Sequence, residues 1–369
     1  MARSIIEEKM EAARKLARVL SDSNDGSIDS IYIAGSLTAG LGNPTSDADL
    51  FVLYAKEAAM GDDVSQYNVD GHRVDVERYT LAFVEEAVGA ITSFRLQRDN
   101  LTDLHKLPSK LDFVCRLYTS ETLLSSPALE GFKQRIVACI GDIRQVAVNY
   151  SAIAINGHLE DFLGASVDGD LETAALVGQD LTAYAGKAVA AASGDLYYSK
   201  KWVYKQLARN PVEGFPTDTF TDFQRGTWTG RGPEAAEELI FFVQTCIAVS
   251  QLLSRQGVPL DVWPAWTAPS VPAADGLWRN PSYNVLGQSD GILLHWELRR
   301  QLMLRDPAAF VWALCDGRGT QAVVEAVARL AEHVPALKTM TAERVEKLLQ
   351  SLRERDLVRA EPFSALSAI

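Results

Sequence analysis

The segment "IAGSLTAGLGNPTSDADLFVLY", residues 33–54, places two aspartates at the start of a short apolar run. Asp47 and Asp49 lie two positions apart, where a strand over residues 50–54 is predicted to begin. Since side chains alternate along a strand, both carboxylates point to the same face. Two carboxylates that close repel one another unless a cation neutralises them, and hard oxygen ligands suit Mg²⁺. The pair therefore predicts a metal site at the mouth of this strand.

A small-residue turn precedes the aspartates. Gly35 and Ser36 follow a predicted strand over residues 30–34. Glycine lets a ligand approach the backbone closely, and a serine with exposed backbone N–H groups can hold phosphate oxygens. A phosphate cradle that faces a carboxylate pair indicates metal-assisted phosphoryl or nucleotidyl transfer.

A third carboxylate comes from the segment "GHRVDVERY", residues 71–79. Two-residue alternation puts Val74 and Val76 on one face of a strand and Asp75 and Glu77 on the other. Asp75 could accept the proton of the attacking nucleophile and help hold a second metal ion. The alternative is structural: an ordinary solvated turn at residues 46–49 and an exposed edge strand here.

Together these elements resemble the DNA-polymerase-β-like nucleotidyltransferase superfamily. The pattern is "AGS" at 34–36, "SDADL" at 46–50 and "VDV" at 74–76, within roughly the first 120 residues. The resemblance implies an enzyme that uses ATP or another NTP with two Mg²⁺ ions. It assigns catalysis and metal binding to Asp47, Asp49 and Asp75, and nucleotide binding to Gly35, Ser36 and Ser46.

The segment "AASGDLYYSKKWVYKQLAR", residues 191–209, resembles nucleotidyltransferases of the kanamycin-modifying type. That resemblance implies that Lys200 and Lys201 neutralise the triphosphate. The alternative is a surface helix with lysines that extend to solvent. In those enzymes a glutamate of the helical domain is the general base. The sequence leaves the base or acceptor contact open among Glu77, Glu160, Asp161, Asp180 and Asp195.

We predict an α+β protein with a small mixed sheet, a helical bundle and a C-terminal winged helix. The expected parts are a catalytic domain (1–125), a helical domain (126–256), a Pro/Trp-rich linker (257–282) and a winged-helix domain (283–369). Hydrophobic periodicity predicts helices over 4–20, 81–91, 132–152, 171–192 and 234–255. Strands are predicted over 30–34, 50–54, 72–78 and 110–117.

Residues 304–330 and 345–358 resemble the PqqD-like peptide-chaperone domains, through "FVWALCDGRGT" and "LRERDLV". The resemblance implies a winged helix that binds leader peptides of ribosomally made natural products. We expect the peptide to add to a free edge of the strand around Ile292–Trp296. A structural or dimerising role is the alternative, and acidic residues within 341–355 disfavour DNA binding. The expected core consists of Trp312, Leu314, Val323, Val327, Leu348 and Leu352.

Composition narrows the function classes. The chain has 369 residues and a formal net charge of −12, which disfavours nucleic acid as a partner. Charged residues in the first 20 positions argue against a signal peptide, and no membrane span is expected. The four cysteines have no zinc spacing and suit buried thiols of a cytoplasmic protein.

The favoured function is transfer of a nucleoside monophosphate, most simply AMP, from NTP to an acceptor with release of pyrophosphate. The acceptor is either a peptide or natural-product intermediate, or a small molecule such as an amino-sugar antibiotic. The intact Asp47, Asp49 and Asp75 argue against a third class, a non-catalytic antitoxin or regulator with the same fold. The sequence leaves a homodimer open.

Overall fold

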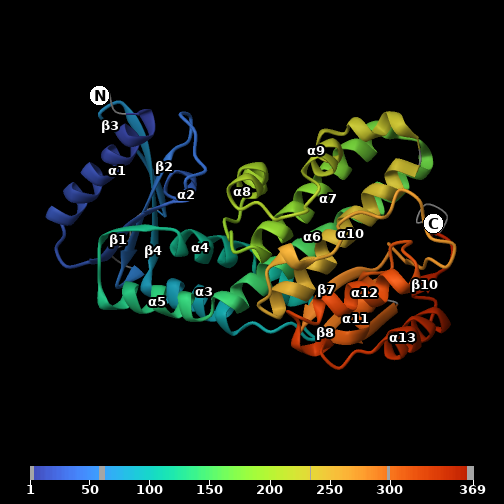
Figure 1. Cartoon of the computed structure of the whole chain (residues 1–369). Helices are drawn as coiled ribbons and strands as arrows, with labels where there is room; N and C mark the ends of the chain where they lie inside the picture. Colours follow the sequence, from blue (N-terminus) through green and yellow to red (C-terminus); the bar gives the residue numbers. More distant parts are fainter. Residues whose placement is uncertain (1–3, 58–62, 233, 297–299, 364–369) are drawn as a thin grey trace. The chain divides into compact units, whose positions relative to one another are not determined.

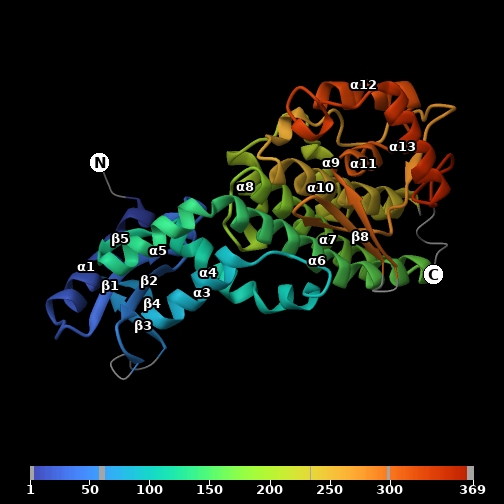
Figure 2. The same cartoon turned by 90° about the horizontal axis from the view of Figure 1, so that it is seen from below.

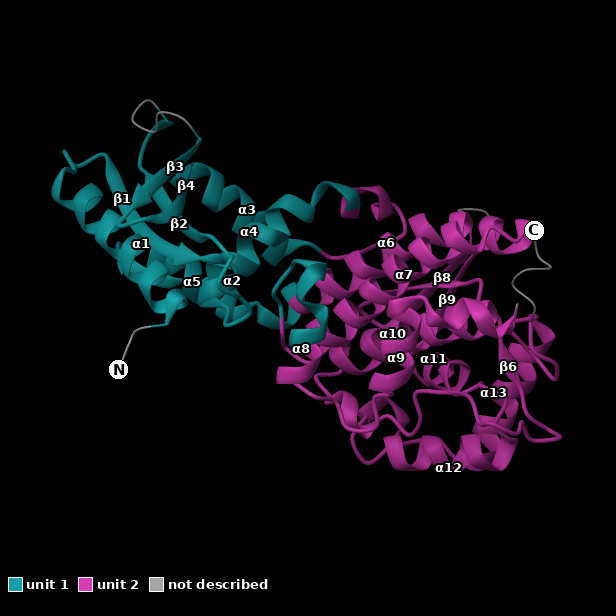
Figure 3. Cartoon of the chain, turned by 90° about the horizontal axis from the view of Figure 1, so that it is seen from above, with its two compact units in different colours: residues 1–94, 105–143, 196–205 teal, residues 95–104, 144–195, 206–369 magenta. Residues whose placement is uncertain are grey.

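The computed structural model describes residues 4–57, 63–232, 234–296 and 300–363. The chain forms two compact units, shown in Figure 3. The first unit contains residues 1–94, 105–143 and 196–205, and the second contains residues 95–104, 144–195 and 206–369. The units differ from the four consecutive parts expected from sequence, because segments far apart along the chain pack into the same unit.

The first unit is built on a mixed sheet of five strands within the described residues, in the order β3-β4-β2-β1-β5. The β2 and β4 strands run parallel and the other neighbours antiparallel. The strands are β1 (Ile28–Ala34), β2 (Ala48–Tyr54), β3 (Val64–Val69), β4 (His72–Thr80) and β5 (Glu121–Leu124). The helices are α1 (Ile5–Asp22), α2 (Gly35–Thr38), α3 (Leu81–Ser93), α4 (Pro108–Tyr118) and α5 (Pro127–Ala138).

Each face of this sheet is covered by different side chains. Helix α1 packs its apolar stripe on one face, against the even-numbered positions of β2 and β4 such as Leu50 and Val74 (Figure 1). The other face carries an aromatic stack in which Phe51 lies 5.0 Å from Tyr32 and 6.1 Å from Tyr79, measured between ring centroids. Side chains of α3 and α4 extend this stack. Both faces are therefore buried in the middle of the sheet.

The mixed α+β fold is confirmed, with one wrong element. Residues 110–117 were expected as a strand and form most of helix α4. Pro108 stands in the first turn of that helix, and the buried positions Leu111, Val114 and Cys115 follow helical spacing. The short strands β3 and β5 were not predicted.

The second unit begins with a helical bundle. Its main helices are α6 (Ile140–Asp168), α7 (Leu171–Ala192), α9 (Thr217–Arg225) and α10 (Glu234–Arg255), with the short α8 (Val203–Arg209) at the boundary of the two units. Of the described helices, α10 is long and apolar enough to cross a membrane, although no such stretch was expected. Its apolar window is 83% buried inside the protein, which is the pattern of a core helix.

The C-terminal part adds two small sheets and three helices. The strands are β6 (Trp278–Arg279), β7 (Asn284–Gln288), β8 (Gly291–Trp296), β9 (Arg300–Arg305) and β10 (Val358–Arg359). Helices α11 (Asp306–Ala313), α12 (Thr320–Leu330) and α13 (Ala342–Glu354) pack on one another (Figure 2). Thr341 caps α13 by accepting a hydrogen bond from the backbone N–H of Arg344. All the expected core residues are buried except Leu348, which is half-buried beside the buried Leu349.

One prediction about this sheet is wrong. The strand β8 was expected to offer a free edge, but it is the central strand of the order β7-β8-β9 and is paired on both sides. The strand was misplaced because its continuous apolar run signals burial on both faces, which is typical of a central strand. The outer strands of the described sheet are β7 and β9.

The segment 257–282 is not a free linker. Trp263 and Trp266 are 5% and 3% exposed, and Trp278 and Arg279 form β6, which pairs with β10. The prolines prevent a helix here, but the indoles bury enough apolar surface to hold the segment against its own unit. The helical bundle and the C-terminal part belong to the same compact unit.

Arg279 joins the helical bundle to the C-terminal part. Its buried guanidinium donates hydrogen bonds to Gln244 Oε1 (2.9 Å) and Thr245 Oγ1 on α10, and to the carbonyl of Ala313 (2.8 Å). The guanidinium carbon also lies 4.0 Å from the ring centroid of Phe241. Burial lowers the pKa of Arg279 to about 10. The charge is thus held by neutral acceptors and a ring face.

We predict that Arg279→Lys destabilises the protein by about 3 kcal/mol, because an ammonium group cannot reach all three acceptors and leaves buried oxygens unpaired. Chemical unfolding of the full chain measures this. Arg344→Lys, at an exposed position of α13, is the control and should change the free energy of unfolding by less than about 0.5 kcal/mol. Equal stability of the two variants would contradict the role of Arg279.

Candidate active site

The parallel pairing of β2 and β4 brings the predicted carboxylates together. Asp49 lies directly opposite Asp75 in the register, and Phe51 lies opposite Glu77. The alternation expected from sequence is observed: Ala48, Leu50, Val74 and Val76 are fully buried on the α1 face, and the carboxylates occupy the other face. Asp47 stands one position before β2, with its side chain 41% exposed. The structure thus places Asp47, Asp49 and Asp75 at one end of the sheet.

Gly35 lies against Asp49. Ala34, the last residue of β1, pairs with Asp49, and Gly35 follows with a φ of +87°. A Cβ atom on residue 35 would overlap Asp49 Oδ2, so any side chain there would displace the carboxylate. Gly35 is therefore required both for its backbone conformation and for the space it leaves.

The Asp49 carboxyl is costly to ionise. Burial raises its pKa to about 6, and Glu77, Asp75 and Asp47 contribute in the same direction. The Arg116 guanidinium of α4 opposes this shift. Burial also opposes the charge of Arg116, but the neighbouring carboxylates, Asp112 first, raise its pKa above the usual value. A bound cation would relieve the repulsion around Asp49.

Arg73 provides a cation beside two of the three aspartates. Its guanidinium binds Asp75 through two hydrogen bonds of 2.8 and 2.7 Å and lies 3.8 Å from Asp47 Oδ1. Among the described residues no group of three His, Cys, Asp or Glu side chains is arranged to hold a metal ion. Carboxylate oxygens are the ligands that Mg²⁺ prefers, and in this structure Arg73 supplies the positive charge beside Asp75 and Asp47.

The other predicted residues of this end have partial support. Ser36 is buried, and its carbonyl accepts hydrogen bonds from the N–H groups of Leu41 and Gly42. Ser46 is part of a turn in which its hydroxyl binds Asn43. Glu77 accepts a 2.7 Å hydrogen bond from the Tyr79 hydroxyl and forms an ion pair with Arg116 at 3.4 Å. Their roles toward a nucleotide stay predictions.

Part of the lysine-containing segment 191–209 belongs to the first unit. Residues 196–205 belong to it, and Tyr197 and Trp202 pack on Leu41, in the loop that follows Gly35 and Ser36. Lys200 and Lys201 are exposed on the short helix η3 (Lys200–Trp202). The segment is therefore attached to the loop that was predicted to cradle phosphate.

Lys205 is a further candidate that the sequence reasoning missed. Its ammonium donates a 2.7 Å hydrogen bond to the carbonyl of Leu41 and lies 4.6 Å from the Trp202 ring centroid. The four-residue spacing from Lys201 is the signal that could have found it. Arg73 could likewise have been found, because it shares the strand face of Asp75. Arg116 was hidden by the wrong assignment of residues 110–117.

The candidate bases of the helical domain lie in the second unit. Glu160 and Asp161 are exposed on α6, and Asp180 on α7 lies 3.8 Å from His158. The Asp195 side chain is only 1% exposed, and it binds Arg209 and Gln206. This arrangement favours a structural ion pair for Asp195. The identity of the base stays a prediction.

Comparison with known proteins assigns both ends of the chain. Residues 13–97 match the family described as "Nucleotidyltransferase domain", a range that includes every predicted metal ligand. Residues 290–358 match the family "Coenzyme PQQ synthesis protein D (PqqD)". The chain combines a nucleotidyltransferase domain with a PqqD domain. The resemblances to nucleotidyltransferases and to PqqD are thereby confirmed, and the resemblance of residues 191–209 to the kanamycin-modifying type stays a prediction.

Two other comparisons add little. A search of curated proteins finds no match to this chain. Among solved structures, a nucleotidyltransferase-like protein from Exiguobacterium sibiricum 255-15 is similar with a TM-score of 0.33 and 12% sequence identity. That match covers 66% of this chain and 76% of the other.

We predict that Asp49→Asn stabilises the protein at neutral pH. The folded pKa of about 6 exceeds the ordinary value of 3.8, so the native state binds the proton more tightly than the unfolded state. The destabilisation by the Asp49 charge is therefore fully present above pH 6 and is lost as the pH falls from 6 toward 4. The gain from the substitution should reach about 2–3 kcal/mol at pH 7.5 and nearly vanish at pH 4.

Chemical unfolding at both pH values, without divalent cations, measures this. Asp70→Asn is the matched control, because Asp70 is exposed and pairs with Lys15 at the surface. It should show no gain at pH 7.5. An Asp49→Asn variant that is no more stable than the wild type at pH 7.5 would show that the carboxylate is not under electrostatic strain.

Proposed function

We propose that this protein transfers a nucleoside monophosphate, AMP in the simplest case, from Mg²⁺-bound NTP to an acceptor and releases pyrophosphate. The observation that carries the proposal is the convergence of Asp47, Asp49 and Asp75 at one end of the sheet. Gly35 lies beside them, at a position where a Cβ atom would overlap the Asp49 carboxylate. The match of residues 13–97 to the nucleotidyltransferase domain supports the same reaction class.

The three aspartates would hold two Mg²⁺ ions, which when bound supply Lewis-acid stabilisation of the phosphoryl oxygens. For this to occur, Arg73 releases Asp75, and Asp49 stays ionised at neutral pH with the help of Arg116. Asp75, on β4 directly opposite Asp49, would accept the proton of the acceptor's nucleophile.

Binding of the triphosphate is assigned to the loop after β1 and to the basic segment that packs on it. Gly35 and Ser36 begin the four-residue helix α2, and Trp202 fixes the segment that carries Lys200, Lys201 and Lys205. Ammonium groups here would offset the charge that develops on the leaving pyrophosphate. The packing of Trp202 keeps these lysines on the unit that holds the aspartates.

The proposed acceptor is a peptide or a peptide-linked natural-product intermediate. Residues 290–358 match the PqqD family, and within that range the outer strand β9 is the candidate for strand addition by an extended peptide. A second candidate acceptor is a cationic amino sugar, which the net charge of −12 favours. A non-catalytic regulator would need neither Mg²⁺ nor turnover.

The decisive experiment combines calorimetry and transfer assays. The full chain is titrated with each of the four NTPs in the presence of Mg²⁺ and then incubated with α-labelled NTP and two acceptor panels, unmodified peptides and kanamycin-type amino sugars. Label on a peptide supports the favoured acceptor, and label on an amino sugar supports the second candidate. Failure of every Mg·NTP to bind would contradict the proposal.

Asp47→Asn should lower turnover by about a thousandfold or more and leave unfolding unchanged, because it removes one metal ligand from a solvent-reachable position. Asp70→Asn, an exposed aspartate on the neighbouring turn, is the matched control and should retain full turnover. Pyrophosphate release measures both. Full activity of the Asp47 variant would remove it from the catalytic set.

Lys201→Ala and Lys205→Ala should raise KM for NTP by roughly tenfold each, since each removes one positive charge from the triphosphate site. Steady-state kinetics with varied NTP at a fixed acceptor concentration, and the reverse, separates the two substrates. If KM changes for the acceptor alone, these lysines belong to the acceptor site.

A further inference from the structure

A large cavity lies within the second unit, apart from the residues that either family match covers. Its volume is about 770 Å³, which is the size of a site for a drug-sized ligand. Its walls come from α9, the start of α10, the Pro/Trp-rich segment and residues 362–363. All of these residues lie outside 13–97 and 290–358.

The cavity is acidic. Its described lining includes five carboxylates, those of Asp218, Asp222, Glu234, Glu237 and Glu238, and two guanidinium groups, those of Arg231 and Arg279. Arg231 forms ion pairs with Asp222 at 2.8 Å and with Glu238 at 3.1 Å. Arg279 is turned to its three hydrogen-bond acceptors in the core. The lining therefore keeps an excess of negative charge.

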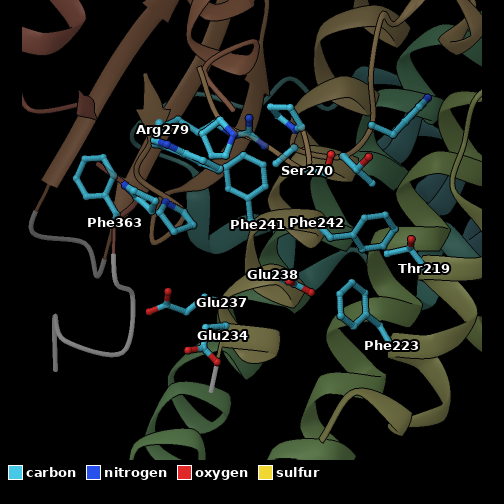
Figure 4. Close-up of a pocket in the computed structure, with 18 of the residues that line it drawn as sticks. Thr219, Phe223, Glu234, Glu237, Glu238, Phe241, Phe242, Ser270, Arg279 and Phe363 are labelled. Atoms are coloured by element: carbon cyan, nitrogen blue, oxygen red, sulfur yellow. The ribbon is translucent and has the colours of Figure 1, made fainter. Parts of the chain in front are cut away.

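The acidic side chains are arranged by helical spacing. Glu234, Glu237, Glu238 and Phe241 stand at positions i, i+3, i+4 and i+7 of α10, so they share one face of the helix. Asp218 and Asp222 are likewise one turn apart on α9. In Figure 4 the three labelled glutamates and the rings of Phe223, Phe241 and Phe242 line the same space.

Aromatic rings form the rest of the wall. Phe223 and Phe242 lie 5.5 Å apart between centroids, and both are at least 97% buried. Trp266 and Trp278 come from the Pro/Trp-rich segment, and Phe363 comes from the end of the described chain. Ring faces next to carboxylates are the combination that binds organic ammonium groups, because both attract positive charge while the rings exclude water.

Acidic residues near helix N-termini also have a structural explanation. Asp218 lies in the first turn of α9, and Glu234 and Glu237 lie in the first turn of α10, where they offset the positive end of the helix dipole. That role needs neither the cavity nor the aromatic rings. It predicts an effect of the glutamates on stability and none on ligand binding.

We propose that this cavity binds a small organic cation with an aromatic or aliphatic body. The ammonium group contacts Glu234 and Glu237, and the apolar body packs on the half-buried rings of Phe241 and Trp278. The prolines of residues 264–281 hold the wall in an extended form, which explains the composition of a segment that does not act as a linker. This site does not depend on the proposed nucleotidyl transfer, since its residues all belong to the second unit.

The experiment compares three probes of one shape on the full chain without nucleotide. These are 2-phenylethylamine, the neutral 2-phenylethanol and the anionic 3-phenylpropionate, each titrated by calorimetry and by ligand-observed NMR. We expect the amine to bind roughly tenfold more tightly than the alcohol, and the carboxylate not to bind. Raising the NaCl concentration should weaken the amine and leave the alcohol unchanged.

Variants locate the site. Glu234→Gln combined with Glu237→Gln should reduce amine binding to the level of the alcohol, and Glu332→Gln, an exposed position outside the cavity, should have no effect. Phe363→Ala should weaken both the amine and the alcohol, because it removes an apolar part of the wall. The proposal is overturned if the alcohol binds as well as the amine, or if the double variant keeps wild-type amine affinity. A double variant that lowers only the unfolding temperature would assign the glutamates to the helix dipole.

Discussion

The first unit depends on the burial of one carboxylate beside one glycine. Asp49 lies on β2, in the middle of the sheet. It is opposite Asp75 on β4 and pairs with Ala34 at the end of β1. Because Gly35 has a positive φ and no side chain, the chain can turn from β1 into α2 directly over that carboxylate. The turn that makes space for Asp49 is also the start of α2, where the sequence predicts a phosphate cradle. One constraint therefore fixes both halves of the candidate site.

Packing in the rest of the first unit stabilises this arrangement. Helix α1 buries the apolar positions of β1, β2 and β4, and the aromatic stack of Tyr32, Phe51 and Tyr79 fills the opposite face. Such a packed sheet holds the strand register, so the aspartates cannot move apart to relieve their repulsion. Burial raises the pKa of Asp49, and the neighbouring carboxylates raise it further. Strain of this kind is expected where a cation binds.

Much of this site was accessible from sequence because it is encoded by local patterns. The period of two in "SDADL" and "RVDVE" predicted which side chains share a face, and the structure bears this out. Residues 110–117 were misread because a short apolar run without a clear period fits a strand or a helix, and Pro108 was not weighed as a helix start. Arg116 comes near Asp49 only through the packing of α4 in the first unit, and no local pattern reports such a contact.

The division into units was the least predictable feature, and the physical reason lies in buried polar contacts. Asn149 on α6 binds Gly287 through both its amide oxygen and its amide nitrogen, and Gln251 on α10 binds Asn149 at 2.7 Å. These bonds join residues that are more than a hundred positions apart in the sequence. The amino-acid composition of the segments between them therefore gives no sign of the contact. Together with Arg279 they join the helical bundle to the C-terminal part within one compact unit.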